Sequence, residues 1–382
     1  MTPTFYEFFA GGGMARAGMG PDWTCLLAND IDEKKGRSYA QNWGTTDLRV
    51  ADVATLSTID APGSVDLAWA SFPCQDLSLA GNGAGLSGSR SGTFLPFWHL
   101  MRKLIAEDRA PRVIALENVC GALTSHDGSD FSTICGLFHQ SGYLVGAMVI
   151  DAAVFLPQSR PRLFIVGVSK DLSLPSGLQL DRSALPWHTR SLVGAQSKLS
   201  SKVKRDWIWW NLPSPPARTV LFEDLIEDNP SGVKWFSKEQ TVRLLSMMSD
   251  VNREKLAIAQ REQRRIVGGV YRRTRPTADG TREQRAEVRF DGLSGCLRTP
   301  AGGSSRQVIL VVEGKSVRAR LVSARETARL MGLPDTYLLP NNYNDAYHLT
   351  GDGVAVPVVR HLAAHLFEPI LQASQPRKTA AA

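Results

Sequence analysis

"TFYEFFAGGGMARAG", residues 4–18, places an apolar segment, a run of glycines and a helical segment in immediate succession. Because glycine has no Cβ, the backbone can turn tightly between strand and helix, and a ligand can approach the chain closely. Asp30 ends the next apolar segment, where a carboxylate can bind ribose hydroxyls. Asp52 follows a third short segment and is placed to meet a base edge. A structural turn would explain the glycines alone. With the two acids they favour a nucleoside cofactor, without separating NAD from S-adenosylmethionine.

The N-terminal part of the chain continues this alternation of strand and helix. We predict strands at residues 4–9, 24–29, 65–70, 112–116, 143–150 and 162–168, and helices at 32–41, 94–107 and 130–140. Such alternation is typical of a mostly parallel sheet with helices on both faces. Near-continuous apolar strands are typical of parallel strands that are buried on both faces. The sequence therefore predicts an α/β fold with a doubly wound, Rossmann-like sheet.

The pattern changes after about residue 175. Residues 171–235 are rich in Pro, Ser and Trp, and residues 252–290 are rich in Arg. This region is typical of a separate, smaller and less regular domain, and we expect "WIWW" (207–210) to belong to its core rather than to stack on bases. Helical spacing returns in "SARETARLMGLPD" (323–335), where Ser323 and Glu326 form a capping-box pattern. A last helix is predicted at about 354–367.

Composition restricts the class of protein. The chain has 382 residues, of which 43% are hydrophobic and 21% charged, as in ordinary globular proteins. No segment approaches the roughly 18 apolar residues of a membrane span. The N-terminus has no signal-like pattern, so we expect a cytoplasmic protein. The five cysteines are scattered, which favours free thiols in a reducing compartment and no metal site.

The formal net charge of +7 is unevenly distributed. Residues 181–320 carry 26 Lys and Arg against 15 Asp and Glu, a net charge of +11, and the remainder carries −4. Such asymmetry favours a polyanionic partner for the basic block. A solvated basic surface is the alternative.

"SFPCQDLSLAG", residues 71–81, places Cys74 directly after the apolar segment "VDLAWA" (65–70). A lone cysteine is more often a buried small hydrophobe than a nucleophile. Here, however, the thiol lies at the carboxyl end of a predicted strand, the edge where α/β sheets bind ligands. The loop that follows, 78–93, is rich in Ser and Gly and could close over a substrate. A thiol in this position can act as a nucleophile once its thiolate is stabilised.

Two further segments carry candidate catalytic groups. Glu117, in "LENV" (116–119), ends another apolar strand and could act as an acid, or could simply be a solvent-facing strand end. In "PQSRPRLFIV" (157–166), Gln158, Arg160 and Arg162 alternate, so on an extended segment they share one side. Two guanidinium groups and an amide on one side suit a base edge or a phosphate. A charged edge strand is the alternative.

In this order and combination, the segments resemble the DNA cytosine-5 methyltransferases. "FFAGGG" is similar to motif I of that family, "SFPCQ" to motif IV, "ENV" to motif VI and "QSRPR" to the Gln-x-Arg-x-Arg of motif VIII. "RLVSARETARLMGLPD" (320–335) is similar to motif IX and "GDGVAVPVV" (351–359) to motif X. The likeness covers about residues 1–170 and 318–367, over half of the chain.

The resemblance implies a reaction. A methyl group would pass from S-adenosylmethionine, leaving S-adenosylhomocysteine, to C5 of a cytosine that is flipped out of duplex DNA. Cys74 would attack C6 of the base, and Glu117 would hold the exocyclic amine and N3. Arg162 would meet the base carbonyl, with Arg160 supporting the same site.

The resemblance also implies an organisation and a set of binding residues. The catalytic domain would be discontinuous, residues 1–175 and 319–382, around a target-recognition domain at 176–318. The residues implied for cofactor binding are Phe9, Ala10, Gly11, Gly13, Asp30, Ile31, Asp52, Val53, Pro73, Phe94, Asp352 and Val354. Those implied for the base and DNA are Gln75, Ser78, Arg90, Asn118, Gln158, Arg272, Arg273 and Arg275. We expect a monomer, acting either alone or alongside a restriction endonuclease that does not bind it.

The chain departs from the family pattern in four places. Glu7 and Met14 stand where Asp and Gly are usual, "SRSGTF" (89–94) has an extra residue, and Asp352 stands where Asn is usual. Asp352 would add a charge beside a zwitterionic cofactor. None of these departures affects Cys74, Glu117 or Arg162, so we expect activity.

Three other functions stay open. The first is a cytosine-5 methyltransferase of RNA, including transfer RNA; the basic middle block favours duplex DNA. The second is a catalytically silent DNA-binding relative, against which Cys74, Glu117 and Arg162 argue. The third is an enzyme of free pyrimidine nucleotides, of the thymidylate synthase type, against which the glycine loop and Asp30 argue.

Overall fold

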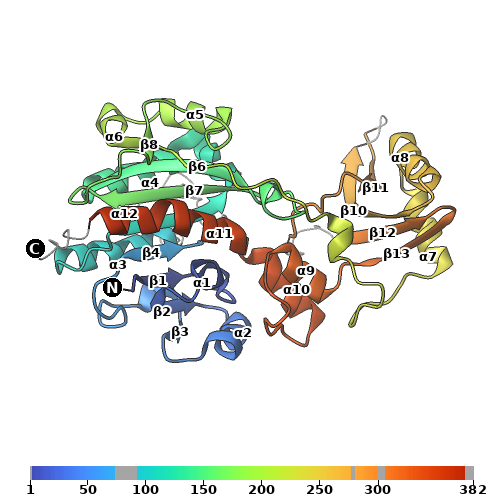
Figure 1. Ribbon diagram of the computed structural model, residues 1–382, viewed down its shortest axis with the longest axis horizontal. Helices are drawn as coiled ribbons and strands as arrows, with labels where there is room; N and C mark the ends of the chain where they lie inside the picture. The colour runs from blue at the N-terminus through green and yellow to red at the C-terminus, as the bar shows by residue number, and fades with distance from the viewer. Residues whose placement is uncertain (1, 74–92, 277–279, 299–305, 375–382) are drawn as a thin grey trace, which may run out of the picture. The chain divides into compact units, whose positions relative to one another are not determined.

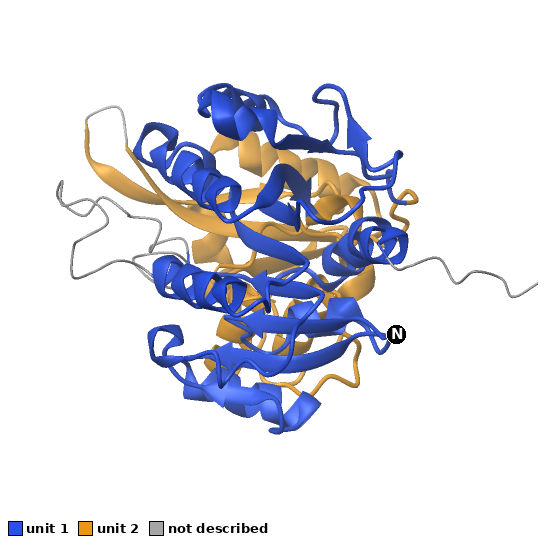
Figure 2. Ribbon diagram, turned by 90° about the vertical axis from the view of Figure 1, so that its left-hand side faces the viewer, with its two compact units in different colours: residues 1–151, 161–215, 354–382 blue, residues 152–160, 216–353 orange. Residues whose placement is uncertain are grey.

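The computed structural model describes residues 2–73, 93–276, 280–298 and 306–374. Cys74, Gln75, Ser78 and Arg90 therefore lie outside the described residues. The chain divides into two compact units, both built from separated segments (Figure 2). Unit 1 comprises residues 1–151, 161–215 and 354–382, and unit 2 comprises residues 152–160 and 216–353.

Unit 1 is built on a mixed sheet, in which the described residues form nine strands in the order β3-β2-β1-β4-β5-β7-β6-β9-β8 (Figure 1). The strands are β1 (Thr4–Phe8), β2 (Thr24–Asp30), β3 (Leu48–Val50), β4 (Leu67–Ala70), β5 (Val113–Val119), β6 (Tyr143–Asp151), β7 (Pro161–Ser169), β8 (Gln179–Leu180) and β9 (Trp207–Trp210). Strands β1 to β5 pair in parallel, whereas β7 runs antiparallel to both β5 and β6. All four residues of β4 are buried, as expected for a central parallel strand.

Helices cover both faces of this sheet. They are α1 (Met14–Met19), α2 (Glu33–Trp43), α3 (Phe94–Ala106), α4 (Ser129–Gln140), α5 (Arg190–Ser197), α6 (Ser201–Arg205), α11 (Val356–Leu362) and α12 (Glu368–Ala373), with a π-helical turn, Ala363–Phe367, between the last two. On one face the Phe8 ring lies 5.0 Å from that of Phe97 in α3. On the other, Trp69 of β4 contacts Phe367. Because successive strand residues point to opposite faces, helices are needed on both. The predicted doubly wound α/β fold is confirmed.

Unit 2 contains a four-stranded antiparallel sheet in the order β11-β10-β12-β13. Its strands are β10 (Arg265–Pro276), β11 (Arg282–Arg289), β12 (Val308–Glu313) and β13 (Ser316–Leu321), and its helices are α7 (Lys238–Ser246), α8 (Asp250–Arg261), α9 (Ala324–Leu330) and α10 (Tyr343–Asp352). Apolar side chains on one face of the sheet, among them Val270 and Val288, pack with Leu244 of α7 and Leu256 of α8. The opposite face of the β10–β11 hairpin is left to polar side chains.

The bounds of the units differ from the expected domain bounds at both ends of the middle region. Residues 176–215 fold with unit 1, because β9 pairs in parallel with β6. The prediction that "WIWW" (207–210) belongs to the small-domain core is therefore wrong. Residues 319–353 fold with unit 2, because β13 pairs with β12 and Arg320 forms a fully buried ion pair with Glu326. The predicted capping box of Ser323 and Glu326 is confirmed at the start of α9.

Two other features of the described residues bear on function. The helical stretch Tyr343–Ala373 is long and apolar enough to cross a membrane by length and composition alone, but 61% of its apolar window is buried, as in a core helix.

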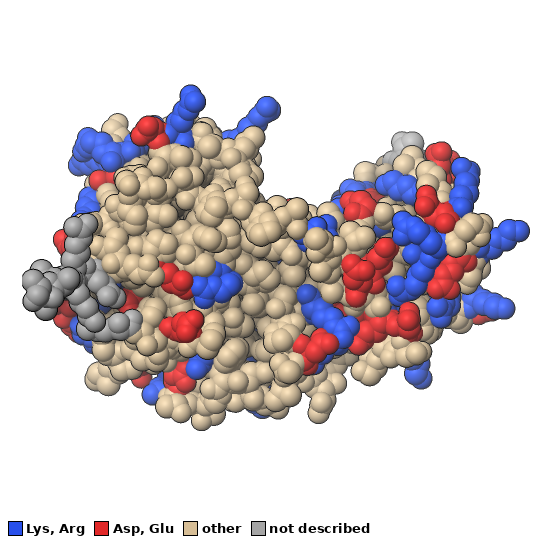
Figure 3. All heavy atoms as spheres, in the orientation of Figure 1, with Lys and Arg blue, Asp and Glu red and all other residues tan. Residues whose placement is uncertain are grey.

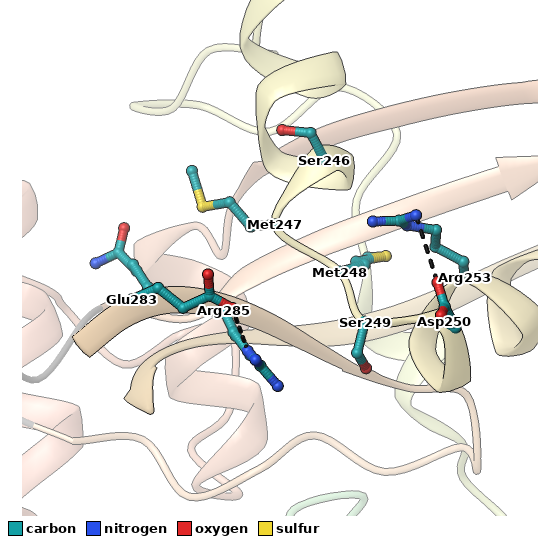
Figure 4. A pocket seen from close by; sticks show the side chains of 9 residues that line it. Ser246, Met247, Met248, Ser249, Asp250, Arg253, Glu283 and Arg285 are labelled. Atoms are coloured by element: carbon teal, nitrogen blue, oxygen red, sulfur yellow. Dashed lines mark hydrogen bonds and ion pairs between the residues drawn. The ribbon is translucent and has the colours of Figure 1, made fainter. Parts of the chain in front are cut away.

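In unit 2, a polar pocket lies between the α7–α8 turn and β11 (Figure 4). Its charged groups pair with each other, Arg253 with Asp250 and Arg285 with Glu283, and it contains none of the predicted site residues.

Candidate active site

The glycine loop leaves the carboxyl end of β1 and is held open by its neighbours. Phe9, Gly11 and Gly13 all have positive φ, at 58°, 57° and 77°. A Cβ at Gly13 would lie 2.3 Å from the indole nitrogen of Trp43, so this position requires glycine. That indole nitrogen in turn donates to the Gly12 carbonyl, at 3.0 Å. The loop is therefore packed against α2 at Gly13, whereas at Gly11 no described atom beyond the adjacent residues lies within 4 Å of an added Cβ.

Asp30 and Asp52 end neighbouring strands on the same edge of the sheet. The Asp30 carboxylate accepts hydrogen bonds from the Gly11 and Asp32 amides, both at 2.8 Å, which fix its direction. Asp52 accepts from the Ala54 amide and starts a short 3-10 turn that includes the buried Val53. Between them Ile31 exposes 66% of its surface, which is unusual for a large apolar side chain. This edge therefore presents two oriented carboxylates and one uncovered apolar side chain.

Glu7 lies beneath the glycine loop and is 1% exposed. Its Oε1 accepts from the Arg16 amide in the first turn of α1, at 3.2 Å. Its Oε2 is buried and has no hydrogen-bond partner among the described residues. Burial raises the pKa of Glu7 to about 8, and the Arg16 amide only partly offsets this. At neutral pH the carboxyl group is therefore largely protonated in the folded chain.

Glu7 should make stability fall as pH rises. Between its ordinary pKa of 4.5 and about 8, the folded chain keeps a proton that the unfolded chain releases. The free energy of unfolding should therefore fall across this range and level off above it. We expect Glu7→Gln to remove this slope and to be more stable than the parent at pH 8.5, by on the order of 2 kcal/mol, with no gain at pH 4.5. Denaturant unfolding at both pH values tests this.

The control is Glu33→Gln, because Glu33 is an exposed residue of α2 that should leave the slope unchanged. An unchanged pH slope in Glu7→Gln would contradict the assignment.

Glu117 and Arg162 form an ion pair at the carboxyl end of β5. Glu117 Oε1 lies 3.1 Å from Arg162 Nε, and the side chains are only 8% and 15% exposed. They meet because β7 runs antiparallel to β5, which places Arg162 beside Val119 in the ladder. A carboxylate and a guanidinium thus lie together at the same edge of the sheet as the glycine loop that follows β1.

The Asn118 side chain links the end of β5 to the segment that leads to Cys74. Its side-chain amide donates to the Phe72 carbonyl at 2.9 Å, and its side-chain oxygen accepts from the Val119 amide at 2.8 Å. Pro73 is exposed and follows directly. The end of β4 is thereby tied to the end of β5 at a point two residues before Cys74. Sequence reasoning assigned Asn118 to the substrate, but missed that its amide serves this backbone connection.

Gln158, Arg160 and Arg162 have different partners, although their alternation predicts a shared side. Gln158 and Arg160 belong to unit 2, where both are buried and both bond to the backbone of Leu297. Arg160 also donates to the carbonyls of Gly351 and Gly353, on either side of Asp352. Arg162 belongs to unit 1 and pairs with Glu117. In the described part of the chain, Gln158 and Arg160 contact backbone groups. Arg162, by contrast, contacts Glu117, which is itself a predicted catalytic residue.

The remaining predicted cofactor residues lie in varied surroundings. Phe94 is fully buried, and its ring packs against those of Phe72 and Trp98, so it supports the chain before Cys74 from below. Ala10 and Val354 are also buried, whereas Asp352 is exposed at the end of α10. Their roles towards a cofactor stay predictions.

Arg272, Arg273 and Arg275 are exposed on β10, but they do not share a face. Arg272 lies opposite Ala286, on the side that carries the core of unit 2. Arg273 and Arg275 lie on the other side, where both pair with Glu287. Sequence reasoning missed Glu287, since its pairing depends on the strand register.

The chain also matches a known protein family over most of its length. The family model described as C-5 cytosine-specific DNA methylase matches residues 3–368. The chain belongs to this family. The predicted family, and with it the prediction of an enzyme of the DNA (cytosine-5-)-methyltransferase type, is confirmed.

Relatives in the C-5 cytosine-specific DNA methylase family match over nearly the whole chain. The type II methyltransferase M.HpaII of Haemophilus parainfluenzae is 25% identical and is covered over 90% of its length by 96% of this chain. M.DsaV of Dactylococcopsis salina is 26% identical, covering 96% of this chain and 86% of its own length. Both are named as type II methyltransferases.

Solved structures support the fold alone. The Dnmt2 methyltransferase of S. pombe superposes with a TM-score of 0.59 at 16% identity, over 96% of this chain and 99% of its own. The methyltransferase EhMeth of Entamoeba histolytica has a TM-score of 0.59 at 14% identity, over 96% and 98%. Among the described residues, no group of three or more His, Cys, Asp and Glu side chains could hold a metal ion.

Proposed function

We propose that this chain methylates C5 of a cytosine flipped out of a short specific sequence in duplex DNA, using S-adenosylmethionine, through a covalent bond between Cys74 and C6. The observation that carries the proposal is the arrangement at the ends of β4, β5 and β7. Glu117 and Arg162 are paired there, and Asn118 ties their strand to the residues that lead directly to Cys74. An acid and a cation thus meet at one edge of the sheet, beside the residues that lead to Cys74.

Each group has a distinct task in this proposal. The Cys74 thiolate adds to C6, which makes C5 nucleophilic. Glu117 holds the exocyclic amine and N3 and offsets charge on the ring, while Arg162 donates to the base carbonyl and orients Glu117. After transfer, the C5 proton leaves and Cys74 is eliminated, which restores the aromatic ring. Flipping the base costs a few kcal/mol, which contacts at this site must offset.

The glycine loop and the two acids fit S-adenosylmethionine. The Asp30 oxygens are oriented by backbone amides and each keeps a lone pair for a ribose hydroxyl. Asp52 would accept from the adenine amine, and the exposed Ile31 would cover the adenine face. When bound, the cofactor supplies an electrophilic methyl group. Glu7, with its raised pKa and unpartnered buried oxygen, would keep a neutral carboxyl group beneath the loop at neutral pH.

Ile31→Ala should weaken cofactor binding without destabilising the fold. Ile31 is 66% exposed, so its truncation removes little buried area from the folded chain. Covering its side chain with adenine should contribute roughly 1 kcal/mol, so we expect S-adenosylhomocysteine to bind about fivefold more weakly by isothermal titration.

The matched control is Ile59→Ala, which truncates an isoleucine that is 90% exposed elsewhere. Equal affinities of Ile31→Ala and Ile59→Ala would remove Ile31 from the cofactor site.

The proposal as a whole is tested by bisulfite sequencing of an unmethylated plasmid after incubation with the protein and S-adenosylmethionine. Protection of cytosines within one short motif would establish both the reaction and its specificity. A parallel incubation with transfer RNA separates DNA from RNA as substrate. Protected cytosines in RNA alone would contradict the proposal. A monomeric state, with no restriction endonuclease bound to the chain, remains part of the proposal.

A further inference from the structure

The β10–β11 hairpin of unit 2 carries an ordered set of charges on the face away from the core. Antiparallel register places Arg273 opposite Arg285 and Arg275 opposite Glu283. Because alternate strand residues point to the same side, charged residues from both strands share this face. That face carries Tyr271, Arg273, Arg275, Glu283, Arg285 and Glu287. Figure 3 shows Lys and Arg interleaved with Asp and Glu over this unit, rather than an unbroken basic patch.

A single carboxylate, Glu287, holds two arginines on this face. Its Oε1 lies 2.6 Å from Arg275 Nη2, and its Oε2 lies 3.3 Å from Arg273 Nε. Arg275 reaches past Glu283, the residue directly opposite it, which pairs instead with Arg285 at 2.5 Å. The Arg273 guanidinium also lies 5.6 Å from the centre of the Tyr271 ring. Both arginines are therefore held along the sheet instead of extending freely into solvent.

Arg273 remains accessible to a ligand although it is paired with Glu287. Arg273 Nε lies 3.3 Å from Glu287 Oε2, and the Arg273 side chain stays 47% exposed, so its guanidinium can still reach a ligand from solvent. Two parallel N–H donors fit a pair of neighbouring acceptors, which both a phosphate and the O6/N7 edge of guanine supply. Glu287 decides between them: its negative charge opposes a phosphate, whereas a base edge is neutral and gains from a guanidinium that is already oriented.

We propose that Glu287 is a positioning residue for sequence recognition. It orients Arg273, and with it Arg275, towards the major-groove edge of a guanine in the target sequence, and it reduces their attraction for phosphates at other sequences. This proposal rests on the proposed function, since it assigns the guanine-reading part of the same DNA substrate.

The test uses the full chain and the sequence motif found by bisulfite sequencing. Initial methylation rates are measured on the target duplex and on duplexes in which each guanine is replaced in turn. We expect Glu287→Gln to lower discrimination at one guanine by about tenfold, because an oriented arginine pair is what discriminates. Glu283→Gln, on the same strand and face, is the matched control and should change no position.

A double-mutant cycle separates positioning from a structural role. If Glu287 acts through Arg273, Glu287→Gln should cause no further loss of discrimination in an Arg273→Ala background. Thermal unfolding of Glu287→Gln should stay close to that of the parent, since the pair is partly exposed.

Two outcomes would overturn the proposal by itself. Glu287→Gln could strengthen binding to all duplexes equally and steepen its salt dependence, which would make the arginines phosphate contacts. Alternatively, discrimination could stay unchanged while the parent methylates normally, which would make the pairs a solvated surface. Absence of DNA methylation by the parent chain would instead overturn the proposed function, and this proposal with it.

Discussion

Cys74→Ala is expected to abolish methyl transfer while leaving DNA binding largely intact. The substitution removes the only atom that can add to C6 in the proposed reaction, and without that addition C5 is not nucleophilic enough to take a methyl group. Binding should persist because Arg273 and Arg275 of unit 2 and the paired Glu117 and Arg162 are unaffected. Incorporation of labelled methyl groups measures the first effect, and a gel shift measures the second.

Cys120→Ala is the matched control for Cys74. Cys120 comes directly after Val119, the last residue of β5, and burial raises the pKa of its thiol. The control should therefore keep its activity. The parent and Cys120→Ala should both form a covalent adduct on DNA that contains 5-fluorocytosine, and Cys74→Ala should form none. Turnover by Cys74→Ala would refute the nucleophile assignment.

Glu117→Gln is expected to lower kcat by roughly a hundredfold to ten-thousandfold, the range for loss of a positioned proton-transfer group. The amide keeps an oxygen for Arg162 Nε, so the fold at the end of β5 should survive. It cannot carry the proton that N3 needs as the ring is attacked, so the loss should appear in kcat more than in KM. Single-turnover methylation at saturating DNA separates these two quantities.

Glu107→Gln serves as the control for Glu117, because Glu107 is an exposed carboxyl group at the end of α3. A Glu117→Gln variant that is folded and methylates at the parent rate would show that Glu117 is only a strand-end residue that pairs with Arg162.

The local features of the fold could be predicted because they depend on neighbouring residues. The strand before Gly11 and the helix after Gly13 follow from apolar spacing and from glycine's freedom at positive φ. The capping box of Ser323 and Glu326 follows from a three-residue spacing. Asp30 could be placed at the edge of the sheet because parallel strands end together there.

Other assignments failed or were incomplete because the partner lies far away in the sequence. The segment 207–210 is apolar and aromatic, a pattern that suits the core of either unit. It joins β6 because Gly146 has no Cβ, which would otherwise lie 2.2 Å from the Ile208 carbonyl oxygen. Likewise, Glu287 could not be connected to Arg275 from the sequence, since Glu283 is the residue directly opposite.

The sequence by itself determined the family and the α/β class. It also singled out Cys74, Glu117 and Arg162 as candidate catalytic residues at the ends of predicted strands. Those properties reside in residue types and short spacings. Only the tertiary structure decided which groups meet: Arg162 with Glu117, Asn118 with the Phe72 carbonyl, and Arg160 with the backbone around Asp352. The physical reason is that a buried donor must find an acceptor, and strand pairing selects that acceptor from distant parts of the chain.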